Sequence, residues 1–131
     1  MTIRRVVPDI ESTRLEESRD FYVGVLGFEP VMDLGFVMTL ASPTNPTAQI
    51  TLMRREGSGG VSPQITVEVA DVDHVHAEAV RRGAEVVYPL TDESWGVRRF
   101  FLRDPNGVVI NVMHHRPRAA AGGPEGREET T

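Results

Sequence analysis

The 131-residue chain contains neither cysteine nor lysine. The absence of cysteine excludes thiol nucleophiles, disulfides and thiolate metal sites. All 14 basic residues are arginine, which excludes lysine Schiff bases, lysine-anchored pyridoxal phosphate and a P-loop lysine. Long apolar runs are missing too: no stretch approaches the roughly 20 residues of a membrane-spanning helix, and the N-terminus lacks the apolar core of a signal peptide.

Charge and length limit the possible binding partners and the number of domains. The formal net charge of -5 argues against nucleic acid and anionic membranes as partners, because neither would attract an acidic protein. The length fits one domain that is built from two half-size modules with a shared core. A hydrophobic fraction of 40% is sufficient for a packed interior. We therefore expect a soluble, cytoplasmic protein.

The sequence contains an internal repeat. Ile50-Thr51-Leu52-Met53 is similar to Ile110-Asn111-Val112-Met113, and Gly27-Phe28-Glu29 is similar to Gly83-Ala84-Glu85. In each half, a strand precedes an amphipathic helix that ends at a glycine, and three strands follow. We predict an α+β fold of two tandem βαβββ modules. They would form a curled, mostly antiparallel sheet around a cleft, with the helices on the outer face.

The expected elements can be placed along the chain. In the first half we predict strands at 3–10, 29–32, 36–40 and 48–53, and a helix that begins at a capping box of Thr13 and Glu16 and ends at Gly27. In the second half we predict strands at 64–69, 85–88, 97–102 and 108–113, and a helix that Asp71 caps and Gly83 ends. A longer loop containing Trp95 would join two of these strands, and the Asp-Pro-Asn-Gly sequence at 104–107 predicts a turn.

These elements define the domain limits. We predict a single domain over residues 1–116, with module one at 3–54, a glycine-rich linker at 55–63 and module two at 64–115. Residues 117–131, which are rich in Ala, Gly, Pro and Glu, are predicted to form a disordered tail.

Alternation along the strands separates two faces of the predicted sheet. One face is uniformly apolar and should pack beneath the helices, as for Leu52 and Val112. The other face combines uncharged hydrogen-bonding groups with thioethers, as for Thr51 and Met113. We expect this mixed face to line the cleft, because two curled half-sheets enclose a concave surface; a solvated outer face is the alternative.

Three motifs carry a family resemblance. They are LEESRDFY at 15–22 followed by VLGF at 25–28, VEVADVD at 67–73, and RDPNG at 103–107 before an apolar strand. In this order, on a duplicated frame over roughly residues 3 to 115, the chain resembles the vicinal oxygen chelate superfamily. That superfamily includes glyoxalase I, extradiol dioxygenases and bleomycin-resistance proteins. The resemblance implies the same fold and a site where metal enzymes hold a divalent ion with His, Glu or Gln.

The resemblance also indicates where such ligands would lie in this chain. It implies positions Thr51 and Asn111 on the last strands, Gln64 on the first strand of module two, and Arg5 or Val7 on the first strand of module one. None is a histidine or a carboxylate, and neutral oxygen donors alone bind divalent transition metals poorly. We therefore predict no metal and no other cofactor.

The histidines do not change this prediction. His74 and His76 lie in the first turn of the second helix and point to different sides. His114 and His115 are neighbours on a strand, so they face opposite ways.

Several other side chains are candidates for the cleft wall. Trp95 would form a stacking platform for a planar ligand, or else close the core edge or a dimer seam. Phe36 and Met38 would form a soft opposite wall, or else fill the core. Only one of the adjacent Arg98 and Arg99 can face the cleft, where it would hold a carboxylate or phenolate.

We predict a metal-independent, bleomycin-resistance-like protein that sequesters a bulky organic ligand or antibiotic, such as an aromatic natural product, and that forms a homodimer as the resemblance implies. The predicted ligand-binding residues are Phe36, Met38, Thr51, Gln64, Trp95, Phe101 and Asn111. One alternative is a glyoxalase-like lyase or isomerase that uses a metal, or uses Glu68 as a general base if burial raises its pKa. Another is a regulatory or partner protein without a ligand.

Overall fold

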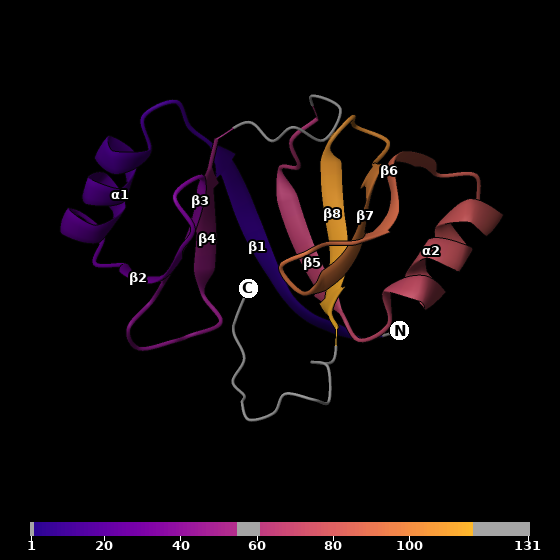
Figure 1. Cartoon of the computed structure of the whole chain (residues 1–131), viewed down its shortest axis with the longest axis horizontal. Coiled ribbons are helices and arrows are strands. Elements are labelled where there is room, and N and C mark those ends of the chain that lie inside the picture. The colour runs from indigo at the N-terminus through magenta and orange to yellow at the C-terminus, as the bar shows by residue number, and fades with distance from the viewer. Residues whose placement is uncertain (1, 55–60, 117–131) are drawn as a thin grey trace.

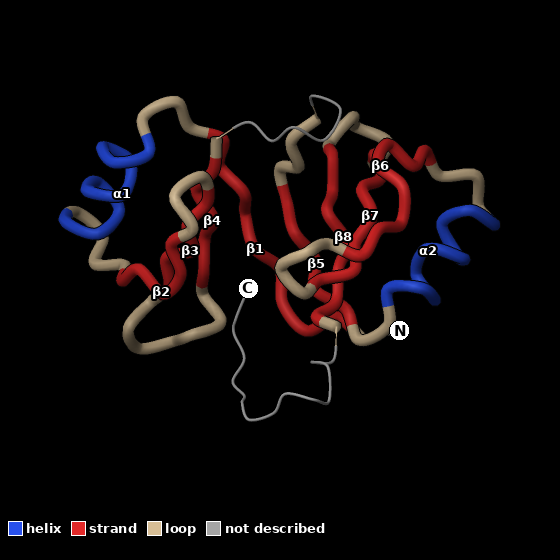
Figure 2. Tube along the Cα trace, viewed as in Figure 1, coloured by secondary structure: helices blue, strands red, loops and turns tan. Residues whose placement is uncertain are grey.

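The computed structural model describes residues 2–54 and 61–116. Within these ranges the elements follow in the order β1 (Ile3–Glu11), α1 (Leu15–Gly24), β2 (Glu29–Asp33), β3 (Val37–Ala41), β4 (Gln49–Met53), β5 (Ile65–Val69), α2 (Val72–Arg81), β6 (Glu85–Asp92), β7 (Val97–Arg103) and β8 (Val109–His115). Two successive βαβββ modules are therefore present, as predicted (Figures 1 and 2). The predicted tail and linker residues 55–60 lie outside the described residues.

The described strands form one eight-stranded sheet in the order β2-β3-β4-β1-β5-β8-β7-β6. The two modules meet at its centre, where β1 and β5 pair antiparallel and Val7 lies opposite Thr66. Within each module the first strand pairs in parallel with the last, β1 with β4 and β5 with β8. The remaining pairs are antiparallel, so the sheet is mostly antiparallel and both modules belong to one chain.

Each helix packs on the outer face of its own half of the sheet, and the two helices lie at opposite flanks (Figure 1). The strand residues that we assigned to the apolar face lie beneath them, with Leu52 in the core under α1 and Val112 in the core under α2. Burial of each such side chain contributes about 1.5–3 kcal/mol. No helix in the described part of the chain is long and apolar enough to cross a bilayer.

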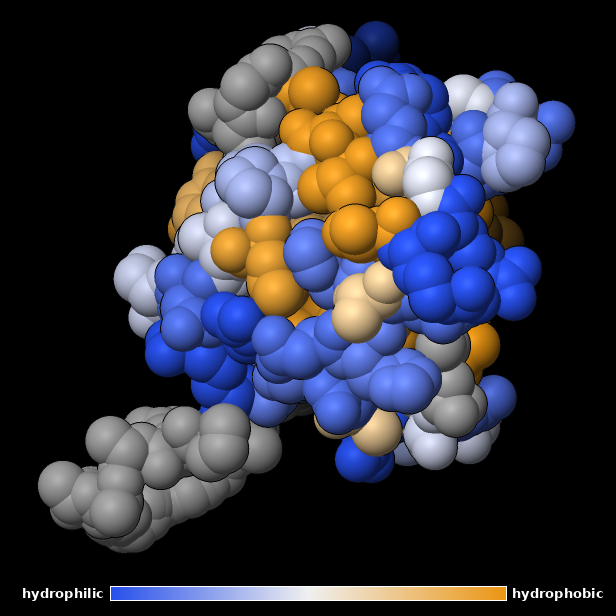
Figure 3. Space-filling view, turned by 90° about the vertical axis from the view of Figure 1, so that its right-hand side faces the viewer, coloured by the Kyte–Doolittle hydropathy of each residue, from blue (hydrophilic) through white to orange (hydrophobic). Residues whose placement is uncertain are grey.

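The side of the molecule that carries α2 is largely hydrophilic, with an apolar strip between the polar groups (Figure 3). Val80 of α2 is one of the large apolar side chains exposed to solvent. The apolar periodicity of α2 is therefore imperfect, although its Val72 and Ala79 are buried against the sheet.

The two helices begin differently. The side chain of Asp71 accepts hydrogen bonds from two backbone amides of the first turn of α2, as predicted. The predicted capping box of α1 is wrong: Arg14 occupies the N-cap position and makes no side-chain cap bond. The Oγ atom of Ser12 accepts the amide of Arg14 at 2.9 Å, so a serine just before Thr13 provides the local acceptor.

The predicted long loop around Trp95 is also wrong. Strand β6 continues to Asp92, and a tight turn connects it to β7. The amide of Glu93 donates to the carbonyl of Val97 at 2.8 Å, and Gly96 has a φ of 95° that favours glycine. Trp95 therefore lies on a short hairpin turn rather than on a longer loop.

Candidate ligand-binding site

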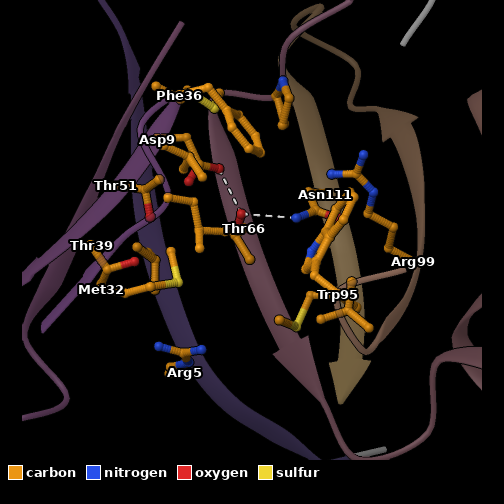
Figure 4. A pocket seen from close by; sticks show the side chains of 17 residues that line it. Arg5, Asp9, Met32, Phe36, Thr39, Thr51, Thr66, Trp95, Arg99 and Asn111 are labelled. Carbon is orange, nitrogen blue, oxygen red and sulfur yellow. Dashed lines mark hydrogen bonds between the residues drawn. The ribbon is translucent and has the colours of Figure 1, made fainter. Parts of the chain in front are cut away.

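A pocket of about 90 Å³ lies on the inner face of the sheet, between the two modules (Figure 4). Strands β1, β4, β5 and β8 supply its central residues, and residues of β2, β3 and β7 supply its sides. Most of its wall is apolar and includes several methionine and valine side chains: Val7, Met32, Val37, Met53, Val97 and Met113. Such an apolar wall around a few polar groups is typical of a small-molecule site.

The structure brings some of the predicted ligand residues together in this pocket: Phe36, Thr51, Trp95 and Asn111. Phe36 and Trp95 are 45% and 49% exposed, so about half of each residue remains accessible from solvent. The binding role of these residues stays a prediction, but their common location is established.

Met38 lies elsewhere. It belongs to the core beneath α1 and is 3% exposed. Strand β3 begins at Val37, and the alternation from that residue directs Val37 and Thr39 to the pocket and Met38 to the helix side. Our placement of Met38 on the cleft wall was therefore wrong, because Phe36 precedes the strand and does not share its alternation.

Gln64 and Phe101 do not line the pocket either. The Oε1 atom of Gln64 accepts the amide of Val109 at 3.0 Å and so ties the starts of β5 and β8 together. Phe101 is fully buried, with the ring of Tyr88 and the guanidinium of Arg99 stacked near it. Both residues therefore stabilise the strands around the pocket without reaching its surface.

The sheet register defines two pairs of equivalent positions at the centre of the site, with one member of each pair in each module. Thr51 of β4 lies opposite Asp9 of β1. In the second module Asn111 of β8 lies opposite Thr66 of β5. Because Thr51 and Asn111 occupy corresponding places in the repeat, Asp9 and Thr66 correspond as well.

The register shows which first-strand residues pair with Thr51 and Asn111: they are Asp9 and Thr66. The ligand positions that the family resemblance implies, Arg5 or Val7 and Gln64, stay a prediction, because strand pairing does not define them. Asp9 adds to the pocket wall a carboxylate that we did not predict. The sequence signal for Asp9 was its alternation with Arg5 and Val7, but nothing in the sequence fixed how far β1 is shifted against β4.

A directed chain of hydrogen bonds crosses the centre of the pocket (Figure 4). The Nδ2 atom of Asn111 donates to Oγ1 of Thr66 at 3.1 Å. The hydroxyl of Thr66 donates to Oδ2 of Asp9 at 2.6 Å. Two further polar atoms, Oδ1 of Asn111 and Oγ1 of Thr39, are buried and have no hydrogen-bond partner among the described residues. Each unpaired atom costs about 1–3 kcal/mol, so a ligand that bonds to it gains an advantage.

The central residues do not fit the divalent metal that the fold family implies. One carboxylate, two hydroxyls and one amide are a weak donor set for a transition metal, which prefers imidazole, thiolate or several carboxylates. In residues 2–54 and 61–116 no group of three or more His, Cys, Asp or Glu side chains is arranged to hold a metal ion.

The two neighbouring histidines on β8 point to opposite sides of the sheet, as predicted. Nδ1 of His114 accepts the amide of Val72 at 2.9 Å on the helix side. Nδ1 of His115 lies 3.1 Å from Oε2 of Glu68. Each histidine is therefore engaged separately.

Glu68 is held in an ion-paired cluster. Besides His115 it contacts Arg5, whose Nε lies 2.5 Å from Oε1 of the carboxylate, and Arg5 also donates to Gln49. The bonds to His115 and Arg5 lower the pKa of Glu68 to about 2, although burial acts to raise it. The condition for Glu68 as a general base, a raised pKa, is not met, and Glu68 does not line the pocket.

The structure distinguishes the two adjacent arginines of β7. Arg98 lies on the outer side, where it pairs with Asp73 and Asp92. Arg99 lines the pocket and is 5% exposed, and its Nε donates to Oε2 of Glu93 at 2.7 Å. The Arg99 guanidinium carbon lies 5.1 Å from the Trp95 ring centroid, a cation–π distance. Arg99 is therefore a fixed part of the pocket wall.

Comparisons with known proteins agree on the fold. The chain is similar to a glyoxalase/bleomycin resistance protein/dioxygenase superfamily member from Vibrio splendidus 12B01, with 20% identity, a TM-score of 0.68, and 86% of this chain and 99% of that chain covered. It is similar to methylmalonyl-CoA epimerase from Mycobacterium tuberculosis, with 23% identity, a TM-score of 0.68 and 92% of both chains covered. A third structure, described as NAD-dependent benzaldehyde dehydrogenase from Legionella pneumophila, shares 16% identity with a TM-score of 0.69 over 85% of this chain and 99% of that chain.

These three structures carry different functional descriptions, so their likeness establishes the fold and not an activity. No curated protein matches the chain. The family model for the Glyoxalase/Bleomycin resistance protein/Dioxygenase superfamily matches residues 6–112, which span both modules and the pocket between them. The chain therefore belongs to the Glyoxalase/Bleomycin resistance protein/Dioxygenase superfamily.

Proposed function

We propose that the protein binds a small organic molecule without a metal, in the pocket between its two modules, and releases it unchanged, as a bleomycin-resistance-like member of the superfamily. The observation that carries this proposal is an apolar pocket whose buried polar atoms, on Thr39 and Asn111, have no partner in the described part of the chain. Polar atoms placed this way orient a ligand while the apolar wall supplies the binding energy.

The pocket dimensions limit the ligand. A cavity of about 90 Å³ encloses only a compact group and not a whole antibiotic. A bulky ligand would therefore insert one group and leave the rest outside, beside the half-exposed residues Phe36 and Trp95. Stacking on these rings would add about 0.5–1.5 kcal/mol each.

An enzyme is the second candidate, and Asp9 favours it. This carboxylate lines the pocket and would be the general base of a metal-independent isomerase or lyase. The fold likeness to the methylmalonyl-CoA epimerase from Mycobacterium tuberculosis also favours proton transfer. Binding remains the better supported function, because an epimerase needs a second group that exchanges protons, and the opposite wall carries Arg99, which stays protonated.

One experiment separates these functions. The protein is incubated with a panel of metals and one-ring and two-ring aromatic compounds, and binding is followed by thermal unfolding and by the fluorescence of Trp95, the sole tryptophan. We expect ligands that raise the unfolding temperature equally with and without a chelator. Mass and chiral analysis should recover them unchanged. Binding that requires a metal, or a recovered product with altered mass or configuration, would contradict the proposal.

The homodimer remains a proposal that the family resemblance supports. Sedimentation velocity over a range of concentrations tests the dimer separately from ligand binding.

A further inference from the structure

We infer that the pocket selects uncharged ligands that carry an N–H or O–H donor, because Asp9 fixes the direction of the hydrogen-bond chain that ends at Asn111. The inference rests on the proposed function, since it names the ligand class of the same pocket. It depends on the hydrogen-bonding capacity of three side chains, Asp9, Thr66 and Asn111.

The direction of the chain follows from its acidic end. An ionised carboxylate accepts hydrogen bonds and donates none. Thr66 has a single hydroxyl proton, and the 2.6 Å contact with Oδ2 of Asp9 uses it. The oxygen of Thr66 can therefore only accept from Asn111, which must present its NH2 group at the 3.1 Å contact.

The orientation of Asn111 then determines what a ligand meets. With its NH2 group turned to Thr66, the amide presents the carbonyl Oδ1 at its other end. Asn111 is 9% exposed and lines the pocket, and its Oδ1 has no partner among the described residues. A buried acceptor of this kind favours a ligand group that donates, and it disfavours an ether or a carbonyl at the same place.

The charged groups in the wall favour an uncharged ligand. Arg5 and Arg99 line the pocket together with one carboxylate, that of Asp9, so the wall carries more positive than negative charge and disfavours a cationic ligand. Both arginines are already paired with carboxylates, Arg5 with Glu68 and Arg99 with Glu93, so a ligand carboxylate would compete with these partners. A neutral ring with an N–H or O–H group avoids both the repulsion of a cation and the competition with Glu68 and Glu93.

The orientation of Asn111 is testable without any ligand. In the free protein, NMR should show nuclear Overhauser contacts between the side-chain NH2 protons of Asn111 and the β and γ protons of Thr66. Absence of these contacts, with the NH2 group near other protons of the pocket, would overturn the inference and leave the proposed function untouched.

The ligand preference is tested with pairs of compounds that differ only in the donor: indole against benzofuran, and phenol against anisole. Dissociation constants come from amide chemical-shift titrations of residues that line the pocket. We expect indole and phenol to bind roughly three- to tenfold more tightly than their partners, the equivalent of one hydrogen bond.

Two variants test whether Asp9 sets this preference. In Asp9→Asn the new amide can donate to Thr66, so the direction of the hydrogen-bond chain can reverse. The ratio of the dissociation constants of non-donor and donor compounds should then fall to near one or below one. Thr66→Val breaks the chain and should also remove the preference, which keeps the test possible if Asp9→Asn does not fold. Asp20→Asn makes the same chemical change at an exposed ion pair on α1 and should retain the preference.

The outcomes are distinct. Equal binding of donor and non-donor compounds by the unmodified protein would overturn the inference alone. A donor preference that persists in Asp9→Asn and in Thr66→Val would show that Asp9 does not set it, and would also overturn the inference. If no compound of either pair binds at the pocket, the proposed function fails and the inference fails with it.

Discussion

Replacement of Thr39 by valine is expected to stabilise the free protein, although it removes a polar group from the candidate site. Thr39 is completely buried on β3, and its Oγ1 has no hydrogen-bond partner among the described residues. Valine has the same branched shape and suits a strand, so the change removes a desolvated hydroxyl at little packing cost. The penalty of such a group is about 1–3 kcal/mol.

The same substitution at Thr66 should change the free energy of unfolding in the opposite direction. Thr66 is also nearly buried, but its hydroxyl donates to Asp9 and accepts from Asn111. Thr66→Val leaves both partners without this bond, so we expect a loss of about 1–3 kcal/mol. The same substitution on the same sheet is therefore expected to raise stability at one position and to lower it at the other.

Urea denaturation at pH 7, followed by circular dichroism, measures both effects. A gain of about 1–2 kcal/mol in Thr39→Val would raise the Tm by roughly 3–8 °C for a domain of this size. The same variant should bind pocket ligands more weakly, since a hydroxyl that can bond to them is gone. Destabilisation by Thr39→Val would refute the reasoning, because it would mean that the hydroxyl has a stabilising partner in the free protein.

Three further predictions concern the residues around the pocket. Because the pKa of Glu68 is lowered to about 2 from its ordinary 4.5, the stability that its ionised form contributes is present above about pH 4.5 and is lost as the pH falls towards 2. Glu68→Gln should flatten this part of the curve of unfolding free energy against pH, and an unchanged curve would contradict the assignment. Arg99→Met leaves the nearly buried Glu93 without its ion-pair partner and should cost about 3–5 kcal/mol in chemical denaturation; Glu93→Gln added to it should restore part of the loss, so additive losses would argue against the pair. Gly96→Ala forces alanine to a φ of 95° and should lower the free energy of unfolding by about 1–2 kcal/mol; a neutral effect in a urea titration would mean that the turn relaxes.

The alternation of apolar and polar residues allowed the two faces of the sheet to be predicted. Leu52 and Val112 lie under the helices, and Thr51 and Asn111 lie in the pocket, as the period of two requires. The end of α2 just before Gly83 and its cap at Asp71 followed from local chemistry. These features depend on residues close together in the chain, so the sequence alone contains them.

Other features depended on residues far apart in the chain. The central carboxylate is Asp9 because β1 pairs with β4 in one particular register, after a bulge near Arg5 has changed its pairing with β5. Arg99 rather than Arg98 faces the pocket because the pairing of β7 with β6 and β8 determines which of its side chains point to the inner face of the sheet.

The sequence by itself therefore determined which residues form strands and helices and which strand residues share a face, because the backbone period is local. Only the tertiary structure decided which polar groups meet, because strand register depends on packing across the whole sheet. It placed Asp9, Thr66 and Asn111 in one hydrogen-bond chain and left an oxygen of Thr39 unpaired among the described residues.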